Sequence, residues 1–143
     1  MILIDTHCHL YSEEFTIDIE SVMARAEKEN VEKFYLPAID SATHAGMILL
    51  EDKYPGKCKA MMGLHPCSVK ENYLDELGIV EGWLGKRKFA AIGEIGLDYY
   101  WDKTFMREQE EAFRKQIELS LHYKLPIVIH TRNAMTETIA VVE

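Results

Sequence analysis

Short apolar runs alternate with amphipathic stretches along the chain. The apolar runs span a few residues each and are rich in branched side chains, which is typical of strands in a parallel sheet. The stretches between them place apolar residues three and four positions apart, which predicts helices with one buried face. The sequence therefore predicts strands and helices in alternation. The five predicted strands are Ile2–His9, Lys33–Ala38, Lys59–His65, Phe89–Gly93 and Pro126–His130.

The longest predicted helix runs from residue 106 to residue 123. Its residues Phe113, Ile117 and Leu121 follow one another at four-residue steps, and Pro126 prevents its continuation. Its charged stretch Glu108–Glu111 is predicted to face solvent. Four other helices are predicted. The first contains the apolar stripe Ile19, Val22, Met23 and Ala26. The other three span Ser41–Lys53, with Ser41 as the cap, Glu71–Lys86 and Ala134–Glu143.

Strands and helices in this order form a parallel sheet covered by helices, which is either an open sheet or a (β/α) barrel. Periodicity does not choose between the two. A closed eight-stranded barrel needs about 250 residues, whereas five strands and their helices occupy all 143 residues here. The sequence ends inside the fifth predicted helix, with no sixth strand. We therefore expect an α/β protein with a single domain, residues 1–143, that is a fragment of a larger fold.

Composition narrows the function classes. Hydrophobic residues make up 48% and charged residues 28%, which excludes a disordered chain. The net charge of −8 excludes a broad basic surface for nucleic acid. The opening apolar run, Met1–Ile4, is too short for a signal peptide or a spanning helix, so we expect a cytoplasmic location and no membrane partner. The three cysteines lack CxxC spacing, so neither a disulfide framework nor a cysteine zinc site is predicted.

The first predicted strand carries two histidines at its carboxyl end. Because side chains alternate along a strand, Asp5, His7 and His9 share one face. Two imidazoles so placed can bind one divalent cation, and Asp5 can orient a ring by hydrogen bonding. The alternative is a polar strand end whose histidines bond to backbone or water.

Two later strands end in residues of the same kind. Glu94 and His130 each follow an apolar run. Because the carboxyl ends of parallel strands meet at one edge, three strands would bring metal-type ligands together there. We therefore predict that His7, His9, Glu94 and His130 form a metal site. The alternative is a solvated carboxylate at Glu94 and a locally bonded histidine at His130.

These positions belong to four sequence motifs, which are His7-Cys8-His9, Gly63-Leu64-His65-Pro66, the run from Gly93 to Tyr100, and Ile129-His130-Thr131-Arg132. Together the motifs resemble the TatD family of metal-dependent hydrolases. The resemblance extends over the whole chain, in the family's order and spacing. It implies a TIM-type barrel of the amidohydrolase kind, of which about the first five strands are present, with divalent metals at its carboxyl-terminal mouth and deoxyribonuclease activity.

The resemblance also implies roles for single residues. His7 and His9 would hold a first metal, Glu94 would bridge two metals, and His130 would bind the second, so that Glu94 and His130 take part in catalysis. The family pattern adds a later histidine and a late aspartate from strands beyond the fifth, so we expect the 143 residues to carry only part of the site. The resemblance also makes His65 and Arg132 candidates for contacting substrate phosphate, while Cys67 departs from the histidine that relatives often carry.

Hydrolysis of a phosphodiester needs an activated water molecule and a stabilised leaving oxygen, and in an acidic protein bound metals would supply both. Two divalent ions can lower the pKa of a water molecule, stabilise the leaving oxygen, and offset the net charge of −8. Imidazoles favour zinc, whereas carboxylates and phosphate substrates favour magnesium or manganese, and both options stay open. Asp98 either supports a metal ligand by hydrogen bonding or forms a turn.

Residues Tyr99, Tyr100 and Trp101 follow the Glu94 strand, where they could stack on unpaired bases. We favour packing in the core or a lid for all three. His44 and His122 lie in predicted helices and are expected at the surface.

The leading hypothesis is a metal-dependent phosphodiesterase that acts on DNA, single-stranded in preference. A second hypothesis keeps the metals and changes the bond to an ester or amide. A third is a non-catalytic module that self-associates through unpaired sheet edges.

Overall fold

The computed structural model describes residues 1–143, in which five strands and five α-helices alternate. The predicted α/β class is therefore confirmed. The strands are β1 (Leu3–Asp5), β2 (Val31–Pro37), β3 (Cys58–Met61), β4 (Ile92–Asp98) and β5 (Ile127–Arg132). The helices are α1 (Ile19–Lys28), α2 (Ser41–Lys53), α3 (Tyr73–Leu84), α4 (Met106–Tyr123) and α5 (Met135–Val142), with short 3-10 turns η1 (Glu13–Phe15) and η2 (Pro66–Ser68).

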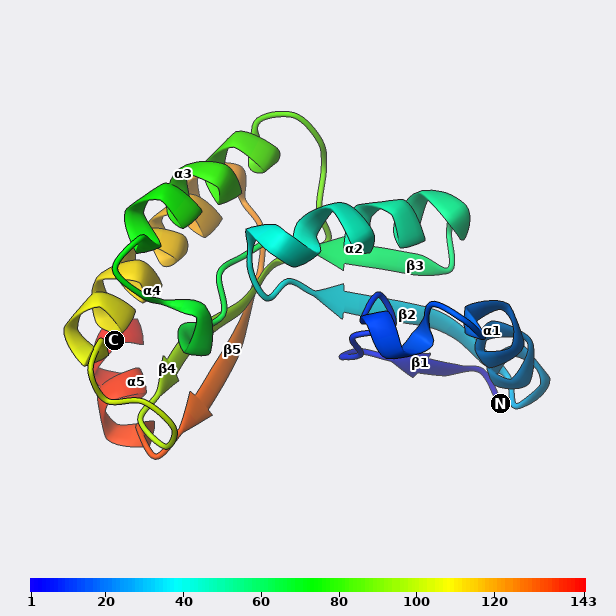
Figure 1. Ribbon diagram of the computed structural model, residues 1–143, viewed down its shortest axis with the longest axis horizontal. Coiled ribbons are helices and arrows are strands. Elements are labelled where there is room, and N and C mark those ends of the chain that lie inside the picture. The colour runs from blue at the N-terminus through cyan, green and yellow to red at the C-terminus, as the bar shows by residue number, and fades with distance from the viewer.

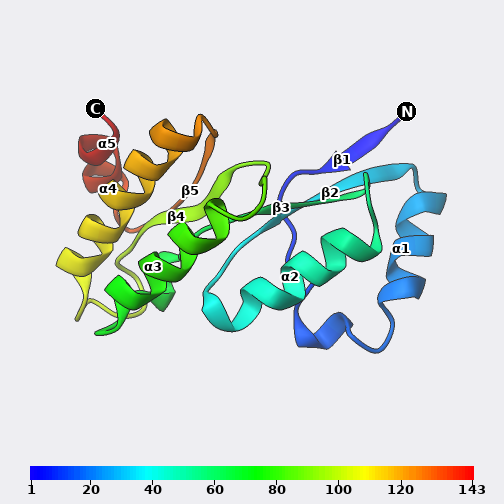
Figure 2. The same ribbon diagram turned by 90° about the horizontal axis from the view of Figure 1, so that it is seen from above.

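All strand pairs are parallel and follow chain order. Strands β1, β2 and β3 form one sheet, and β4 and β5 form another. A bridge between Met62 and Ile92 joins the two, and the Gly93 N–H donates to the Met62 carbonyl at 2.9 Å. Helices α2, α3 and α4 lie on the outer side of this bent surface (Figures 1 and 2). Strands β1 and β5 lie at opposite ends and do not pair with each other, so no barrel is closed.

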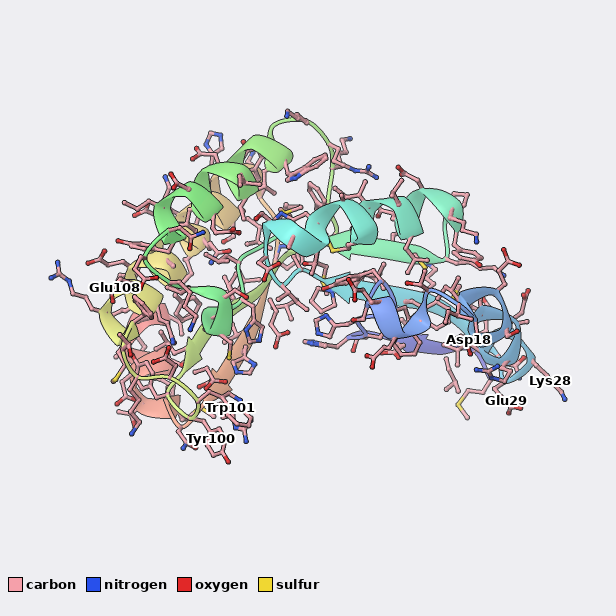
Figure 3. The ribbon with its side chains drawn as sticks, viewed as in Figure 1. Asp18, Lys28, Glu29, Tyr100, Trp101 and Glu108 are labelled. Carbon is pink, nitrogen blue, oxygen red and sulfur yellow. The ribbon has the colours of Figure 1, made fainter.

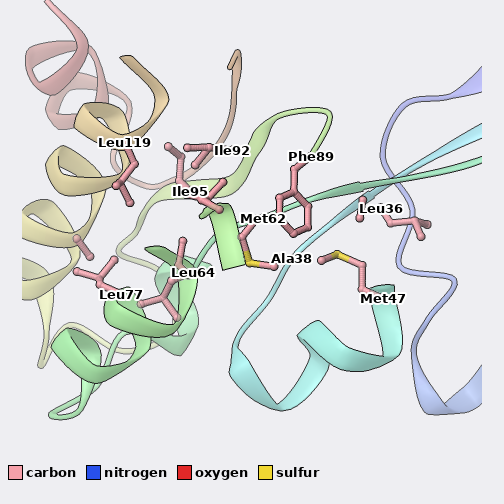
Figure 4. Close-up of a cluster of buried hydrophobic side chains, with 14 of the residues drawn as sticks. Leu36, Ala38, Met47, Met62, Leu64, Leu77, Phe89, Ile92, Ile95 and Leu119 are labelled. Carbon is pink, nitrogen blue, oxygen red and sulfur yellow. The ribbon is translucent and has the colours of Figure 1, made fainter. Parts of the chain in front are cut away.

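One cluster of 24 buried residues forms the core between the strands and the helices. Phe113 of α4, Leu36 of β2 and Ile95 of β4 are fully buried in it. Figure 4 shows side chains of this cluster, among them Leu36, Met62 and Ile92. Each large aliphatic or aromatic side chain buried in this way stabilises the fold by about 2 kcal/mol. None of the helices combines the length and hydropathy that a membrane crossing requires.

The first predicted strand is too long. Strand β1 ends at Asp5, so His7 and His9 lie in the loop that follows it. The cause is local, because the Asp5 carboxylate accepts the His7 backbone N–H at 3.1 Å and turns the chain out of the ladder. Similarly, β3 ends at Met61, and His65 begins the turn η2 four residues later.

The prediction Phe89–Gly93 is displaced towards the amino terminus. Strand β4 begins at Ile92 and runs through two glycines, so Glu94 lies inside the strand instead of at its end. Glycine usually weakens a strand. Here Gly96 has φ 142°, and a Cβ on it would collide with the His130 carbonyl oxygen of β5. The glycine therefore permits the close approach of β4 and β5 that brings Glu94 to His130.

The buried face of α4 differs from the predicted one. Leu121 is 74% exposed, whereas Gln109 and Gln116 are 3% and 1% exposed. The solvated face predicted for Glu108–Glu111 is therefore wrong at Gln109. The two glutamines lie two helical turns apart and point to the same side as Phe113.

Helix α2 starts with a cap that the sequence did not identify. Asp40, not Ser41, is the N-cap, in a capping box with Thr43. Ser41 instead donates its hydroxyl to Glu76 at 2.6 Å. His44, expected at the surface, is 1% exposed. Its Nε2 lies 3.0 Å from the Gly63 carbonyl oxygen, and this hydrogen bond makes its burial possible.

Candidate metal centre

The carboxylate of Glu94 is the centre of a cluster of imidazoles from three other segments of the chain. Its side chain is 8% exposed. Four ring nitrogens face it: Oε2 lies 3.1 Å from His7 Nε2, 3.7 Å from His9 Nε2 and 3.8 Å from His65 Nε2, and Oε1 lies 3.0 Å from His130 Nδ1. The structure therefore brings the four residues predicted as metal ligands together and adds His65 to them.

The hydrogen bonds of His9 determine which of its nitrogens is free. The Tyr11 hydroxyl donates to the Pro37 carbonyl, so it must accept from His9 Nδ1, which lies 2.9 Å away. The proton of the neutral His9 ring is then on Nδ1. Its Nε2, which faces Glu94, keeps a lone pair that can bind a metal. Tyr11 is thus a functional residue that the sequence reasoning missed.

His130 lies between two carboxylates. Its Nδ1 is 3.0 Å from Glu94 Oε1, and its Nε2 is 2.8 Å from Asp98 Oδ2. Asp98 can therefore hold the Nε2 proton and leave Nδ1 to a metal, the usual arrangement of a carboxylate behind a ligating histidine. The Asp5 carboxylate, predicted to orient a ring, accepts the His7 backbone N–H with its Oδ1.

His65 has the opposite tautomer to His9. Its Nδ1 accepts the Cys67 backbone N–H at 3.0 Å, so the neutral ring carries its proton on Nε2. Burial foremost lowers the pKa of His65 to about 4, which keeps the ring neutral at neutral pH. Its Nε2 is therefore a hydrogen-bond donor that faces the Glu94 side of the cluster.

The ionisation of the carboxylates follows from these contacts. Burial alone raises the pKa of Glu94, but the contacts of its carboxylate with the surrounding imidazoles, that of His130 foremost, outweigh it and lower the pKa below its usual value. The hydrogen bond to Glu94 raises the pKa of His130. Glu94 is thus a carboxylate at neutral pH, with lone pairs available on both oxygens.

The donor set fits two neighbouring divalent cations. The ligand atoms of His7, His9 and Glu94 lie within 4.8 Å of one another, and so do those of Glu94 and His130. His65 lies in this second group too, but its protonated Nε2 would donate a hydrogen bond instead of binding a metal. Glu94 belongs to both groups, which is the position of a bridging carboxylate. Neutral imidazoles and carboxylates suit zinc, and a carboxylate with open positions also suits manganese or magnesium.

Two buried glutamines of α4 hold the backbone on either side of the centre. Gln116 Oε1 accepts the Leu64 N–H at 2.7 Å, and its Nε2 donates to the Leu64 carbonyl at 3.2 Å. Gln109 pairs in the same way with the N–H and carbonyl of Asp98, at 2.8 and 3.1 Å. Each glutamine replaces a neighbouring strand for one residue. They fix the chain next to His65 and at Asp98.

A family model described as "TatD related DNase" matches residues 4–143. The chain belongs to the TatD family. This confirms the resemblance carried by the sequence motifs.

Relatives of the TatD family cover nearly the whole chain. The protein named "Uncharacterized metal-dependent hydrolase YabD" of Bacillus subtilis is 35% identical over 141 residues, which are 99% of this chain and 55% of the relative. The "3'-5' ssDNA/RNA exonuclease TatD" of Dickeya dadantii is 30% identical over 132 residues, 92% of this chain and 50% of the relative. The crystal structure of YjjV, a TatD homologue from Escherichia coli, superposes with a TM-score of 0.89 at 31% identity and covers 96% of this chain and 54% of that one. The chain therefore spans about half the length of the relatives it matches.

The aromatic run after β4 in this TatD-family chain divides into two parts. Tyr99 is 6% exposed and packs in the core, as predicted. Tyr100 and Trp101 are 48% and 69% exposed, so the packing prediction is wrong for them (Figure 3). The Arg132 guanidinium, expected to contact phosphate, lies 3.7 Å from the centroid of the Tyr100 ring.

Proposed function

We propose that this chain supplies the metal-binding part of a TatD-type hydrolase that cleaves phosphodiester bonds of single-stranded nucleic acid. The observation that carries the proposal is the sharing of Glu94 by two sets of imidazoles. One oxygen faces His7 and His9, and the other faces His130. The five strands would be the first five of an eight-stranded barrel.

The proposed assignment gives each residue one task. His7, His9 and Glu94 would hold one ion, and Glu94 and His130 the other. When bound, two divalent ions supply Lewis acidity towards a phosphoryl oxygen and lower the pKa of water. Asp98 keeps the proton on Nε2 of His130.

Two further residues prepare the centre for an anionic substrate. Tyr11 keeps the His9 proton on Nδ1, so that Nε2 points its lone pair into the centre. The Nε2–H of His65 faces the same space and would donate to a nonbridging phosphate oxygen. A neutral donor serves here without repelling the cations.

A nucleic acid substrate is supported by the names of relatives, one of which is a 3'-5' ssDNA/RNA exonuclease. In a chain of net charge −8, the cations would supply the positive charge that attracts phosphate. The three cysteines are free thiols, which a reducing compartment maintains, and we propose a cytoplasmic location on that ground.

The test uses a chimaera, because the chain spans about half of its relatives' length. Residues 1–143 are joined to the remaining carboxyl-terminal part of YabD and incubated with manganese, magnesium or zinc and a labelled single-stranded DNA. We expect cleavage that requires metal and that falls at least 100-fold, by the scale of such losses, in the Glu94→Gln variant. Turnover of a carboxylic ester without cleavage of DNA would instead support the ester or amide hydrolase.

The 143-residue chain is assayed alone in parallel. We expect it to bind metal and to cleave DNA slowly or not at all. The reason is that the family pattern places another histidine and an aspartate in the half of the relatives that this chain does not span. The unpaired edge of β1, where Ile2 and Ile4 are 64% and 50% exposed, leaves self-association as a prediction that sedimentation of the same sample tests.

A further inference from the structure

Tyr100, Trp101 and Arg132 form an exposed stack at the carboxyl ends of β4 and β5. The Tyr100 and Trp101 rings lie edge to face, with centroids 4.7 Å apart. The Arg132 guanidinium lies 3.7 Å from the Tyr100 centroid and 5.2 Å from that of Trp101. Trp101 is 69% exposed, so most of its indole contacts no other group. Exposed large aromatic side chains that are held in place in this way are typical of binding surfaces.

The stack is tied to the metal centre through one side chain. Asp98 Oδ1 accepts the Tyr100 backbone N–H at 3.0 Å, and Asp98 Oδ2 lies 2.8 Å from His130 Nε2. Gln109 in turn holds the Asp98 backbone from α4. The backbone of Tyr100 is therefore tied through Asp98 to His130, one of the residues of the metal centre.

The charges around the stack favour a base over a phosphate as the occupant. Lys70, a neighbouring cation, is paired with Asp102 at 3.0 Å. Arg132 forms no ion pair, but its planar face is on the Tyr100 ring, which is how arginine takes part in stacking. The chain has a net charge of −8, so it offers no broad basic groove for a nucleic acid. Stacking on aromatic rings does not need such a groove.

We propose that Tyr100, Trp101 and Arg132 form a stacking site for one unpaired nucleobase of a single-stranded nucleic acid. The proposal rests on the proposed function, since the metal centre positions the adjoining phosphate. Bases in a duplex are already stacked on their neighbours, so the site favours single strands. Every base has a π-face, so the site accepts any sequence.

The test measures binding by the 143-residue chain in the presence of Mn²⁺, which needs no turnover. The probes are a fluorescein-labelled oligothymidylate and an abasic oligonucleotide of the same length, which keeps the phosphates and lacks the bases. Fluorescence anisotropy should show tighter binding of the oligothymidylate. Trp101→Ala should weaken that binding about tenfold, the scale of one base–aromatic stack, and leave binding of the abasic probe unchanged.

Matched variants control for indirect effects. Trp101→Phe keeps a ring and should retain most of the affinity, and Trp83→Phe on α3 should bind both probes as the unmodified chain does. Because the chain has two tryptophans, Trp83→Phe also leaves Trp101 as the sole tryptophan. The fluorescence of Trp101 in this variant should be quenched by oligothymidylate and not by the abasic probe.

Equal affinity of the chain for the two probes, or an equal loss for both in Trp101→Ala, would overturn the stacking site. Base-dependent binding without any cleavage by the chimaera would sink the proposed hydrolase and leave the stacking site in place. Cleavage by the chimaera, together with equal affinity of the chain for the two probes, would overturn the stacking site and leave the proposed hydrolase in place.

Discussion

Replacing Gln116 by leucine tests whether the glutamines of α4 hold the centre in place. Gln116 is 1% exposed and satisfies both backbone groups of Leu64. Leucine is of similar size and apolar, so it fills the space but leaves the Leu64 N–H and carbonyl without partners. His65 follows directly, so its position depends on the same contacts.

The expected loss of stability follows from those two groups. A buried backbone group without a partner costs about 1–3 kcal/mol, so the pair costs about 4 kcal/mol. Burying leucine in place of a polar side chain returns about 1–2 kcal/mol. The free energy of unfolding should therefore fall by about 2–3 kcal/mol.

Urea unfolding of the metal-free chain, followed by circular dichroism, measures this difference. Lys115→Leu is the matched control, because Lys115 is the exposed neighbour on the same helix and its replacement should change stability by less than about 0.5 kcal/mol. A loss below about 1 kcal/mol in Gln116→Leu would refute the reasoning, since it would mean that the Leu64 backbone finds other partners at little cost.

Three other changes test single features. Tyr11→Phe removes the acceptor for His9 Nδ1 and should weaken Zn²⁺ binding about tenfold in calorimetry; an unchanged dissociation constant would argue against the tautomer assignment. Gly96→Ala should destabilise the chain by about 3 kcal/mol or more in urea unfolding, because a Cβ meets the His130 carbonyl; a stable variant would show that β4 and β5 can separate freely. Burial lowers the pKa of His44 below its ordinary value of 6.5, so the unfolded chain takes up the proton first and this contribution to stability, complete above pH 6.5, is lost as the pH falls. In His44→Gln, the free energy of unfolding should therefore fall less between pH 7.5 and pH 5 than in the unmodified chain. An equal fall in both would mean that other groups cause the pH dependence.

The order of elements and the residues of the cluster could be predicted from the sequence, because apolar periodicity and strand order depend on local pattern. The strand bounds could not. The turn at Asp5 depends on one side-chain hydrogen bond, and the passage of β4 through Gly96 depends on how closely β5 approaches. The first is a local side-chain contact and the second a tertiary one, and apolar periodicity reports neither.

The polar residues that support the centre could not be predicted from the sequence either. The sequence pattern predicts that Gln109 faces solvent and does not single out Gln116, because a buried glutamine is identified only by the backbone groups that it satisfies. The roles of His9 and His65 differ through the partners of their Nδ1 atoms, a hydroxyl and a backbone N–H. Their spacing could not distinguish them.

Crystals of the chain soaked in Mn²⁺ provide the most direct test of the central claim, which is that Glu94 is shared by two cations. Anomalous diffraction should show one peak about 2.2 Å from His7 Nε2, His9 Nε2 and a Glu94 oxygen, and a second at the other Glu94 oxygen and His130 Nδ1, as expected for metal–ligand bonds. Full occupancy of Mn²⁺ elsewhere on the molecule, with neither position filled, would contradict the account.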